Sequence, residues 1–272
     1  MEGEENIELL LEDLVLENEN ENERDDLVEG IRNITGYEFS DRRLLVQAFT
    51  HHSYNENCSS YERLEYIGDS VLNLMVAEEH YFLYPDLQPG DLTRLRAANV
   101  DTEKLARAAL KHHLYKFLRH NKPFLARQIK EFEDAVVEYP LHSWGLIDAP
   151  KALADVVESL IGAIYIDSNS SMNITCQITK DLLQPVITRE SVQTHPVTML
   201  YEICQKNGRK VNIRDSWRKT GEIEIFVDGK FAGRGKYDAK KLIAVNRAAH
   251  NAYQQILRKL VHENAQYVPS PN

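Results

Sequence analysis

Apolar residues recur at spacings of three and four from about residue 27 to residue 190, and no run of alternating apolar and polar residues interrupts them. Such spacing places the apolar side chains along one face of a helix. Proline and glycine separate the periodic segments from one another. The pattern predicts an all-α domain with helices over Leu27–Thr35, Arg42–Phe49, Glu62–Tyr84, Asp91–Asn99, Thr102–Ala109 and Asp148–Asp167.

The pattern changes after Pro185. Val197–Asn207 keeps a helical spacing, and Gly208 is typical of a residue that ends a helix. Alternating segments follow, in which Asp228–Gly229 favours a hairpin turn, and a last helix is expected over Ala239–Val261. This order predicts a small α+β (α-β-β-β-α) domain with strands over Lys210–Trp217, Glu222–Asp228 and Phe231–Asp238.

The charge distribution separates the two ends of the chain. The net charge is −10, yet residues 1–30 hold thirteen acids and one arginine, whereas residues 194–262 hold fourteen Lys/Arg and six Asp/Glu. The basic C-terminal module is therefore suited to a polyanion. We expect a multi-domain chain, with an acidic disordered tail over 1–26, the all-α domain over 27–190, the α+β domain over 194–262 and a C-terminal tail over 263–272.

Several classes of protein do not match this composition. Three cysteines without metal-ligand spacing favour a reducing compartment. No apolar run approaches the roughly 18 residues of a membrane span, and we see no secretory signal. We therefore expect no membrane association and a location in the nucleus or cytoplasm, because no strong basic cluster indicates a more specific target.

The segment YERLEYIGDSVLNLM carries its acids on one side of a helix. If Glu62 is placed at 0°, Glu65 lies at about 300° and Asp69 at about 340°, because each helical residue advances by about 100°. The face between about 120° and 220° is apolar and is expected to be buried. It consists of Leu64, Ile67, Val71, Leu74 and Met75.

A second segment, ALADVVESLIGAIYID, repeats this arrangement with Asp155 and Glu158. Gly162 lies on the acidic side one turn later, where a missing side chain permits close approach of a helix or a ligand. Clustered carboxylates repel one another unless a cation neutralises them, and a hard divalent ion held by oxygen ligands meets that demand. The alternative is a solvated acidic face, which two matching strips beside apolar packing make the weaker interpretation.

The sequence ERLEYIGDSVL closely resembles the signature of ribonuclease III. Three further segments agree in the same order: AFTHHSY (48–54), PGDLTRLRAANV (89–100) and PKALADVVESLIGAIYIDS (150–168). The resemblance implies a helical, homodimeric nuclease that uses Mg²⁺, with Mn²⁺ as a substitute. It implies metal ligation by Glu65, Asp69, Asp155 and Glu158, catalytic roles for Asp69, Glu158 and a supporting Glu62, and a dimer contact through Tyr66.

The chain departs from the bacterial pattern in two places. Pro89 stands where bacterial members often have a glutamate. Dicer-like enzymes also have proline at this position, so we expect that a metal contact from that loop is dispensable here. Residues 112–148 are longer than the bacterial counterpart and look like the insertion of plant ribonuclease-III-like proteins, which suggests a plant origin. Lys151 follows the eukaryotic pattern and is interpreted either as a phosphate contact or as an ordinary surface lysine.

The C-terminal module resembles a double-stranded-RNA-binding domain, which recognises the shape of A-form RNA. The resemblance places Glu202 and Gln205 at a minor groove and Lys240 and Lys241 at phosphates. The loop WRKTGE lacks the usual Pro and His, and the usual third lysine is absent, so we expect weaker RNA binding than is typical. A protein-docking domain that no longer binds RNA is the alternative.

The leading functional hypothesis is an endoribonuclease that cleaves double-stranded RNA by magnesium-dependent phosphodiester hydrolysis. The resemblance implies products with a 5′-phosphate and short 3′ overhangs, and a role in RNA processing or silencing. The alternative is a catalytically silent double-stranded-RNA-binding partner or regulator of Dicer-type enzymes, acting in one version through dimerisation with another family member. Silent relatives usually lose a carboxylate, whereas this chain keeps all of them, which favours the nuclease.

Overall fold

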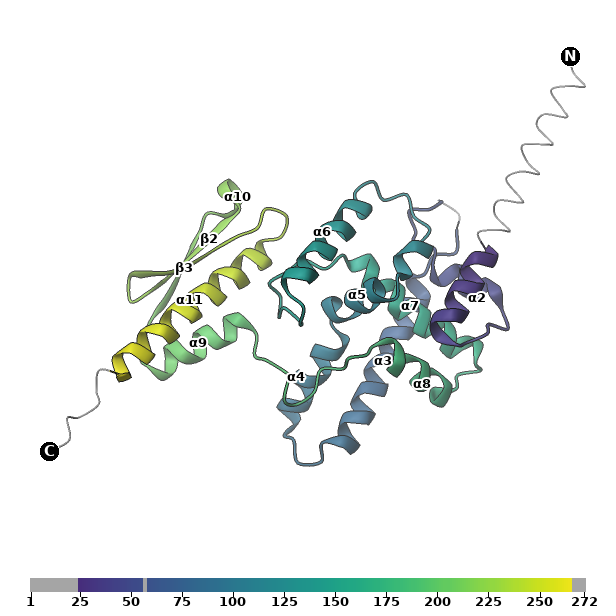
Figure 1. The fold of residues 1–272 in the computed structure, drawn as a ribbon, viewed down its shortest axis with the longest axis horizontal. Coiled ribbons are helices and arrows are strands. Elements are labelled where there is room, and N and C mark those ends of the chain that lie inside the picture. The colour runs from purple at the N-terminus through teal and green to yellow at the C-terminus, as the bar shows by residue number, and fades with distance from the viewer. Residues whose placement is uncertain (1–23, 56–57, 266–272) are drawn as a thin grey trace, which may run out of the picture. The chain divides into compact units, whose positions relative to one another are not determined.

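The structure is a computed structural model that describes residues 24–55 and 58–265 (Figure 1). The chain forms two compact units. The first contains the described residues up to Lys130 together with Ala149–Arg189, and the second contains Glu131–Asp148 and the described residues from Glu190 onward. Most of the predicted acidic tail and of the predicted C-terminal tail lies outside the described residues.

The first unit is helical, as the apolar spacing predicts. In its described residues the only β-pairing is an isolated bridge between Thr50 and Arg119. Its helices are a segment over residues 24–35, α2 (Arg42–Ala48), α3 (Glu62–Leu83), α4 (Pro89–Val100), α5 (Thr102–Lys111), the short 3₁₀ helix η1 (Leu114–Phe117), α6 (Leu125–Glu138), α7 (Lys151–Asp167) and α8 (Met172–Leu182). The C-terminal part of α6, from Glu131 onward, belongs to the second unit.

The sequence analysis began α4 two residues too late, at Asp91 rather than Pro89, began α7 three residues too early, and missed η1, α6 and α8. Helix α7 begins at Lys151 rather than Asp148, because Pro150 caps it in an extended conformation and disfavours helix in the residue before it. Helix α7 is also not amphipathic as predicted. It is buried on nearly all sides, from Ala152 to Ile164, as expected for a helix at the centre of a bundle.

Two glycines let α3 and α7 approach until their backbones touch. A Cβ atom added at Gly68 would lie 1.8 Å from the carbonyl oxygen of Glu158, and one added at Gly162 would lie 2.1 Å from that of Leu64. The close approach at Gly162 is therefore to a helix. It brings the acidic strip of α3 beside that of α7.

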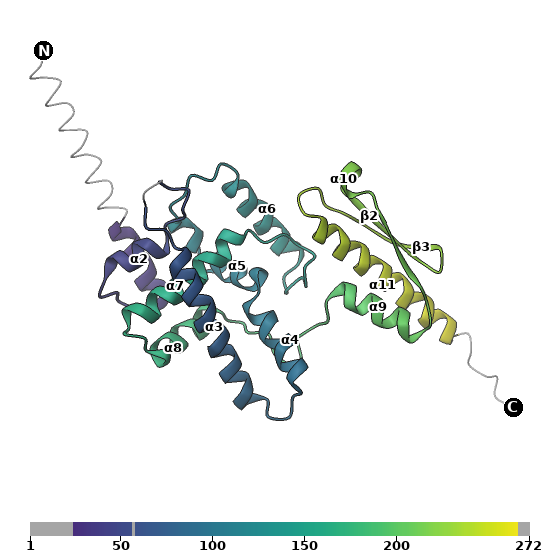
Figure 2. The same cartoon turned by 180° about the vertical axis from the view of Figure 1, so that it is seen from behind.

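The second half of α3 forms a hairpin with α4, and the two helices lie side by side in both views (Figures 1 and 2). The prediction that Leu74 is buried was wrong, because it lies in this hairpin with 56% of its surface exposed. Leu72, which the helical angles placed outside the apolar face, is completely buried instead.

The second unit contains the predicted α-β-β-β-α order. Its antiparallel sheet has the strand order β1-β2-β3, and Val211 pairs with Val227 while Glu222 pairs with Lys236. A short helix, α10, occupies the connection between β1 and β2. The elements are α9 (Pro196–Lys206), β1 (Val211–Asp215), α10 (Trp217–Thr220), β2 (Glu222–Val227), β3 (Lys230–Lys236) and α11 (Lys241–Ala265).

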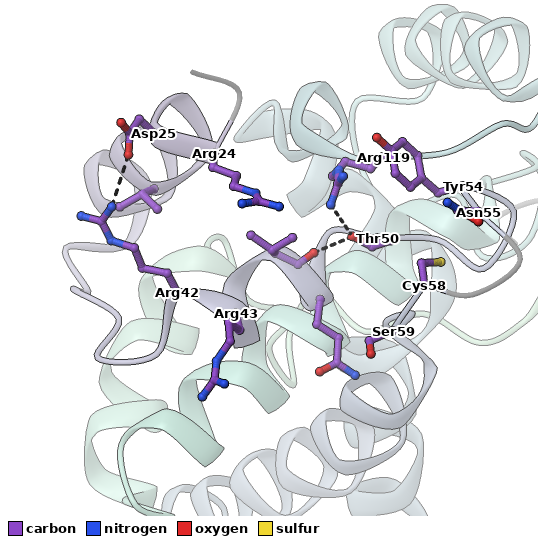
Figure 3. Close-up of a pocket in the computed structure, with 13 residues that line it drawn as sticks. Arg24, Asp25, Arg42, Arg43, Thr50, Tyr54, Asn55, Cys58, Ser59 and Arg119 are labelled. Carbon is purple, nitrogen blue, oxygen red and sulfur yellow. Dashed lines mark hydrogen bonds and ion pairs between the residues drawn. The ribbon is translucent and has the colours of Figure 1, made fainter. Parts of the chain in front are cut away.

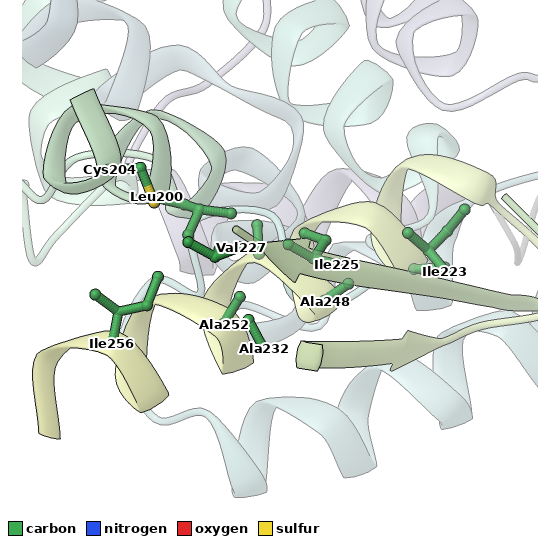
Figure 4. Packing of buried hydrophobic residues seen from close by; sticks show 11 residues of the cluster. Leu200, Cys204, Ile223, Ile225, Val227, Ala232, Ala248, Ala252 and Ile256 are labelled. Carbon is green, nitrogen blue, oxygen red and sulfur yellow. The ribbon is translucent and has the colours of Figure 1, made fainter. Parts of the chain in front are cut away.

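The core of the second unit lies between the sheet and the helices α9 and α11 (Figure 4). Apolar side chains of β2 meet a row of alanines on α11, including Ala248 and Ala252. Gly233 and Gly235 in β3 permit this packing, because added Cβ atoms would come within 2.4 Å of the Ala252 nitrogen and 2.1 Å of the Ala244 oxygen. Small residues on both elements therefore hold the helix against the strands.

Among the described residues, no helix combines the length and apolar character that crossing a membrane requires.

Candidate metal centre and basic module

Three carboxylates converge where α3 and α7 touch. Ligand oxygens of Glu65 on α3 and of Asp155 and Glu158 on α7 all lie within 4.8 Å of one another. A cavity of about 500 Å³ opens beside them, and it is also lined by Glu62, Tyr66 and Asp69. The structure thus places every predicted metal ligand at one cavity, with Asp69 on its wall rather than in the group of three.

The electrostatics of this group favour either bound protons or a cation. Burial, and then the neighbouring Asp69, Asp155 and Glu65, raise the pKa of Glu158 to about 8. Burial also raises the pKa of the Asp155 carboxyl, and the charge of Glu65 acts in the same direction. Both shifts come first from burial and then from neighbouring carboxylates, and a bound cation would oppose both effects.

The Lys151 ammonium group supplies a positive charge between two of these carboxylates. Its Nζ atom lies 2.8 Å from Glu65 Oε1 and 2.5 Å from Asp155 Oδ1. Burial lowers the pKa of Lys151, but the hydrogen bonds to Asp155 and Glu65 outweigh burial and raise it. A cluster of carboxylate oxygens that already attracts one cation suits a hard divalent ion. Neither interpretation of Lys151 drawn from the sequence included this contact.

Neighbouring side chains that the sequence analysis missed orient the carboxylates. The buried Tyr61 hydroxyl donates to Asp155 Oδ2 at 3.1 Å, and burial followed by this carboxylate raises the pKa of Tyr61. Asn73 donates to Asp69 Oδ1 at 2.8 Å, and Arg96 Nη1 donates to Asn73 Oδ1 at 2.8 Å. The spacing of four between Asp69 and Asn73 was a visible signal, because such residues are neighbours on a helix.

Glu62 lies at the rim and has different partners. Its carboxylate accepts a hydrogen bond from Ser60, and His52 Nδ1 lies 2.7 Å from its Oε1 atom. The hydrogen bond from Ser60, and then that from His52, lower the pKa of Glu62. Glu62 lies outside the group of three, and its supporting role stays a prediction.

Tyr66 lies on α3 between Glu65 and Asp69, and 77% of its surface is exposed. The ring is therefore mostly open to solvent beside a cluster of acids. A dimer contact through Tyr66 stays a prediction.

The predicted RNA-binding residues lie on α9 and at the N-terminal end of α11, with Lys240 directly before the helix. Glu202 and Gln205 are exposed on α9, on the side away from the buried Leu200 and Cys204. The two lysines at the start of α11 already have carboxylate partners. Lys240 Nζ lies 2.5 Å from Asp148 Oδ1, and Lys241 forms an ion pair with Asp215.

The end of the insertion packs against this part of the second unit. Asp148 also accepts a hydrogen bond from Tyr237, while Arg247 Nε donates to the Leu146 carbonyl at 2.9 Å. Asn246 donates to the Gly145 carbonyl at 2.8 Å, and Gly145 has a φ of +87° with no room for a Cβ atom against Asn246. Residues 145–148 therefore form a clasp over the start of α11.

Comparisons with known proteins identify both domains. The sequence model of the Ribonuclease III domain matches residues 62–169, and that of the Double-stranded RNA binding motif matches residues 196–256. Ribonuclease 3-like protein 3 of Oryza sativa subsp. japonica is 48% identical over 237 residues, which are 86% of this chain and 79% of the relative. Ribonuclease 3-like protein 2 of the same organism is 38% identical over 235 residues, covering 83% and 74%. A solved nuclease domain of ribonuclease III from Campylobacter jejuni is 29% identical and covers 58% of this chain and 96% of that domain, with a TM-score of 0.45.

Proposed function

Because this chain belongs to the ribonuclease III family of endoribonucleases, we propose that it cleaves double-stranded RNA by magnesium-dependent hydrolysis of phosphodiester bonds. The observation that carries the proposal is the convergence of Glu65, Asp155 and Glu158 within 4.8 Å, beside a cavity that Asp69 also lines. Mn²⁺ is the expected substitute, because it takes the same oxygen ligands.

Glu65, Asp69, Asp155 and Glu158 are the residues that would hold the metal. When bound, a divalent ion activates water as a nucleophile and stabilises the leaving oxygen of a phosphodiester. Tyr61 fixes the orientation of Asp155, and Asn73 with Arg96 fixes that of Asp69. Such support for ligating carboxylates commonly changes metal affinity or activity by about 10- to 100-fold.

Metal binding is proposed to require a change in the protonation state of Glu158. The raised pKa of about 8 favours the protonated carboxyl while the site lacks a divalent cation. Glu158 must lose this proton to become a ligand, because metals bind the carboxylate form. Lys151 must also release Glu65 and Asp155, and its ammonium group is then free to contact a phosphate of the substrate.

The second unit would deliver the duplex. Glu202 and Gln205 are proposed to contact a minor groove, and Lys240 and Lys241 the phosphates. A homodimer formed through Tyr66 would place two acidic sites on one duplex, each cutting one strand. The proposed products carry a 5′-phosphate and a short 3′ overhang, which suits a role in RNA processing or silencing.

The test is cleavage of an end-labelled, perfectly paired RNA by the purified chain with Mg²⁺ and with a chelator. We expect Mg²⁺-dependent cutting of the duplex, no cutting of either single strand alone, and loss of activity in Asp69→Ala. Asp181→Ala is the matched control, since it removes an exposed acid from α8. Absence of cleavage by the wild type, or equal cleavage by Asp69→Ala, would refute the proposal.

A further inference from the structure

The first unit has a second hollow that shares no lining residue with the acidic cavity. A cavity of about 730 Å³ lies between residues 24–35, α2 and the residues 50–55 and 58–59 (Figure 3). An adjoining cavity of about 400 Å³ shares Arg24, Val46, Tyr54 and Arg119 with it. We call the two together the basic recess.

The basic recess carries more positive than negative charge. Its larger cavity is lined by four arginines and one aspartate. Two of the arginines are neutralised, because Arg42 lies 3.2 Å from Asp25 and Arg43 lies 2.8 Å from Asp41. The other two, Arg24 and Arg119, have no carboxylate partner among residues 24–55 and 58–265. Two guanidinium charges are therefore available to an anion.

Arg119 is held in place before any ligand binds. Its backbone nitrogen donates to the Phe49 carbonyl at 2.8 Å, and its carbonyl accepts from His51 at 2.9 Å. Its Nη1 atom donates to the buried Thr50 hydroxyl at 3.3 Å, and its guanidinium lies 4.2 Å from the centre of the Tyr54 ring. A donor fixed in this way loses little entropy when it binds a ligand.

Figure 3 shows the guanidinium groups of Arg24 and Arg119 directed into the hollow from opposite sides, beside the Thr50 hydroxyl. The planar fork of an arginine matches two oxygens of a phosphate. The volume far exceeds that of a phosphate ion and lies within the range of small-molecule sites. Val28 and Val46 line the same cavity and offer apolar surface to a ring attached to the phosphate.

Hydrogen bonds of backbone and side-chain atoms connect the basic recess to the acidic site. The Thr50 carbonyl accepts a hydrogen bond from the Tyr61 nitrogen at 2.9 Å, and the Tyr61 hydroxyl contacts Asp155. Gln47, which lines the recess, donates to the Ser60 carbonyl at 3.0 Å, and Ser60 in turn bonds to Glu62. An anion held in the recess would thus lie on the same framework that fixes the catalytic carboxylates.

We propose that the basic recess is a binding site for a phosphate ester, with Arg24 and Arg119 gripping the phosphate oxygens and the apolar wall taking the attached nucleoside. The phosphate belongs either to the RNA substrate or to a free mononucleotide. The first source rests on the proposed function, and the second does not.

The test uses the full chain in two arms. In the first, adenosine 5′-monophosphate is titrated calorimetrically into the metal-free protein; in the second, KM and kcat are measured for duplex RNA with Mg²⁺. Arg24→Gln and Arg119→Gln are expected to weaken binding by about tenfold each, because each removes a charge-assisted contact. Arg32→Gln is the matched control, because Arg32 lies on the same helical segment and pairs with Glu38 outside the recess.

The two arms separate the sources. A raised KM with unchanged kcat in both variants assigns the phosphate to RNA, whereas weaker mononucleotide binding with unchanged KM assigns it to a free nucleotide. If Arg119→Gln does not fold, the Arg24→Gln variant, which changes an exposed side chain, is sufficient for both measurements. No effect of Arg24→Gln in either arm, or an equal effect of Arg32→Gln, overturns the site. If the wild type does not cleave RNA, the proposed function fails, while the titration still decides whether the recess binds phosphate.

Discussion

Gly68 of α3 lies against the backbone of Glu158 in α7, so closely that a Cβ atom at Gly68 would stand 1.8 Å from the Glu158 carbonyl oxygen. This contact fixes the distance between the two helices that carry the carboxylates. The geometry of the acidic cluster therefore depends on a residue that has no side chain of its own.

Gly68→Ala is expected to force the two helices apart. Overpacking of this kind costs about 1–3 kcal/mol, so the free energy of unfolding falls by that amount and activity falls with it. Gly90→Ala is the matched control, since a Cβ atom there meets nothing within 4 Å. Urea unfolding of both variants measures the difference, and equal stabilities would contradict the close approach.

Glu158 makes the stability of the metal-free protein depend on pH. Because its pKa is raised to about 8 in the folded chain, the folded state holds a proton that the unfolded state has lost. Stability due to this group is therefore present at low pH and is lost as pH rises from about 5 to about 8. Thermal unfolding of the wild type and Glu158→Gln without metal, at a series of pH values, measures it. The decline should be smaller in the variant; identical profiles would exclude the shift.

Asn73 is expected to act through Asp69, to which it donates at 2.8 Å. Asn73→Ala should lower metal affinity or activity by about 10- to 100-fold, because a ligating carboxylate loses its support. Ser70→Ala is the control, since the Ser70 hydroxyl donates to the Tyr66 carbonyl of its own helix rather than to a carboxylate. If Asn73→Ala keeps wild-type activity at limiting Mg²⁺, Asp69 does not need this contact.

The clasp is expected to oppose RNA binding, because Asp148 forms an ion pair with the Lys240 ammonium group that a phosphate would otherwise contact. Asp148→Ala should tighten binding of duplex RNA by about two- to fivefold at low salt, the range of one exposed ion pair. Fluorescence anisotropy without metal measures this, with Asp181→Ala as the control for the lost charge. Adding Lys240→Ala to Asp148→Ala should remove the gain; a gain that persists would mean that Lys240 is not the group released.

Local periodicity predicted the helices that carry Glu65 and Asp155, because an amphipathic pattern depends only on neighbours in the sequence. It failed where burial is decided by distant segments. Helix α7 is buried on nearly all sides, and Leu74 is exposed in a hairpin. Both outcomes depend on segments that are distant in the sequence. The contact of Lys151 with Glu65 spans 86 positions, so spacing alone gave no sign of it.

The association of residues 131–148 with the basic module was also invisible in the sequence. Those residues lie within the segment that the helical pattern assigns to the first domain, and Asp148 meets Lys240 across 92 positions. In contrast, the α-β-β-β-α order was predictable, because alternation and turn residues encode strands locally. Long-range ion pairs and helix crossings were the parts that required the structure.

Binding of Mn²⁺ to the RNA-free protein, followed by electron paramagnetic resonance of the free ion, tests the metal centre most directly. The account predicts that the wild type binds Mn²⁺ and that Glu158→Gln and Asp155→Asn each weaken binding by at least about tenfold. Glu78→Gln, which alters an exposed acid elsewhere on α3, should leave it unchanged. No binding by the wild type, or equal binding by Glu158→Gln, would contradict a metal site at these carboxylates.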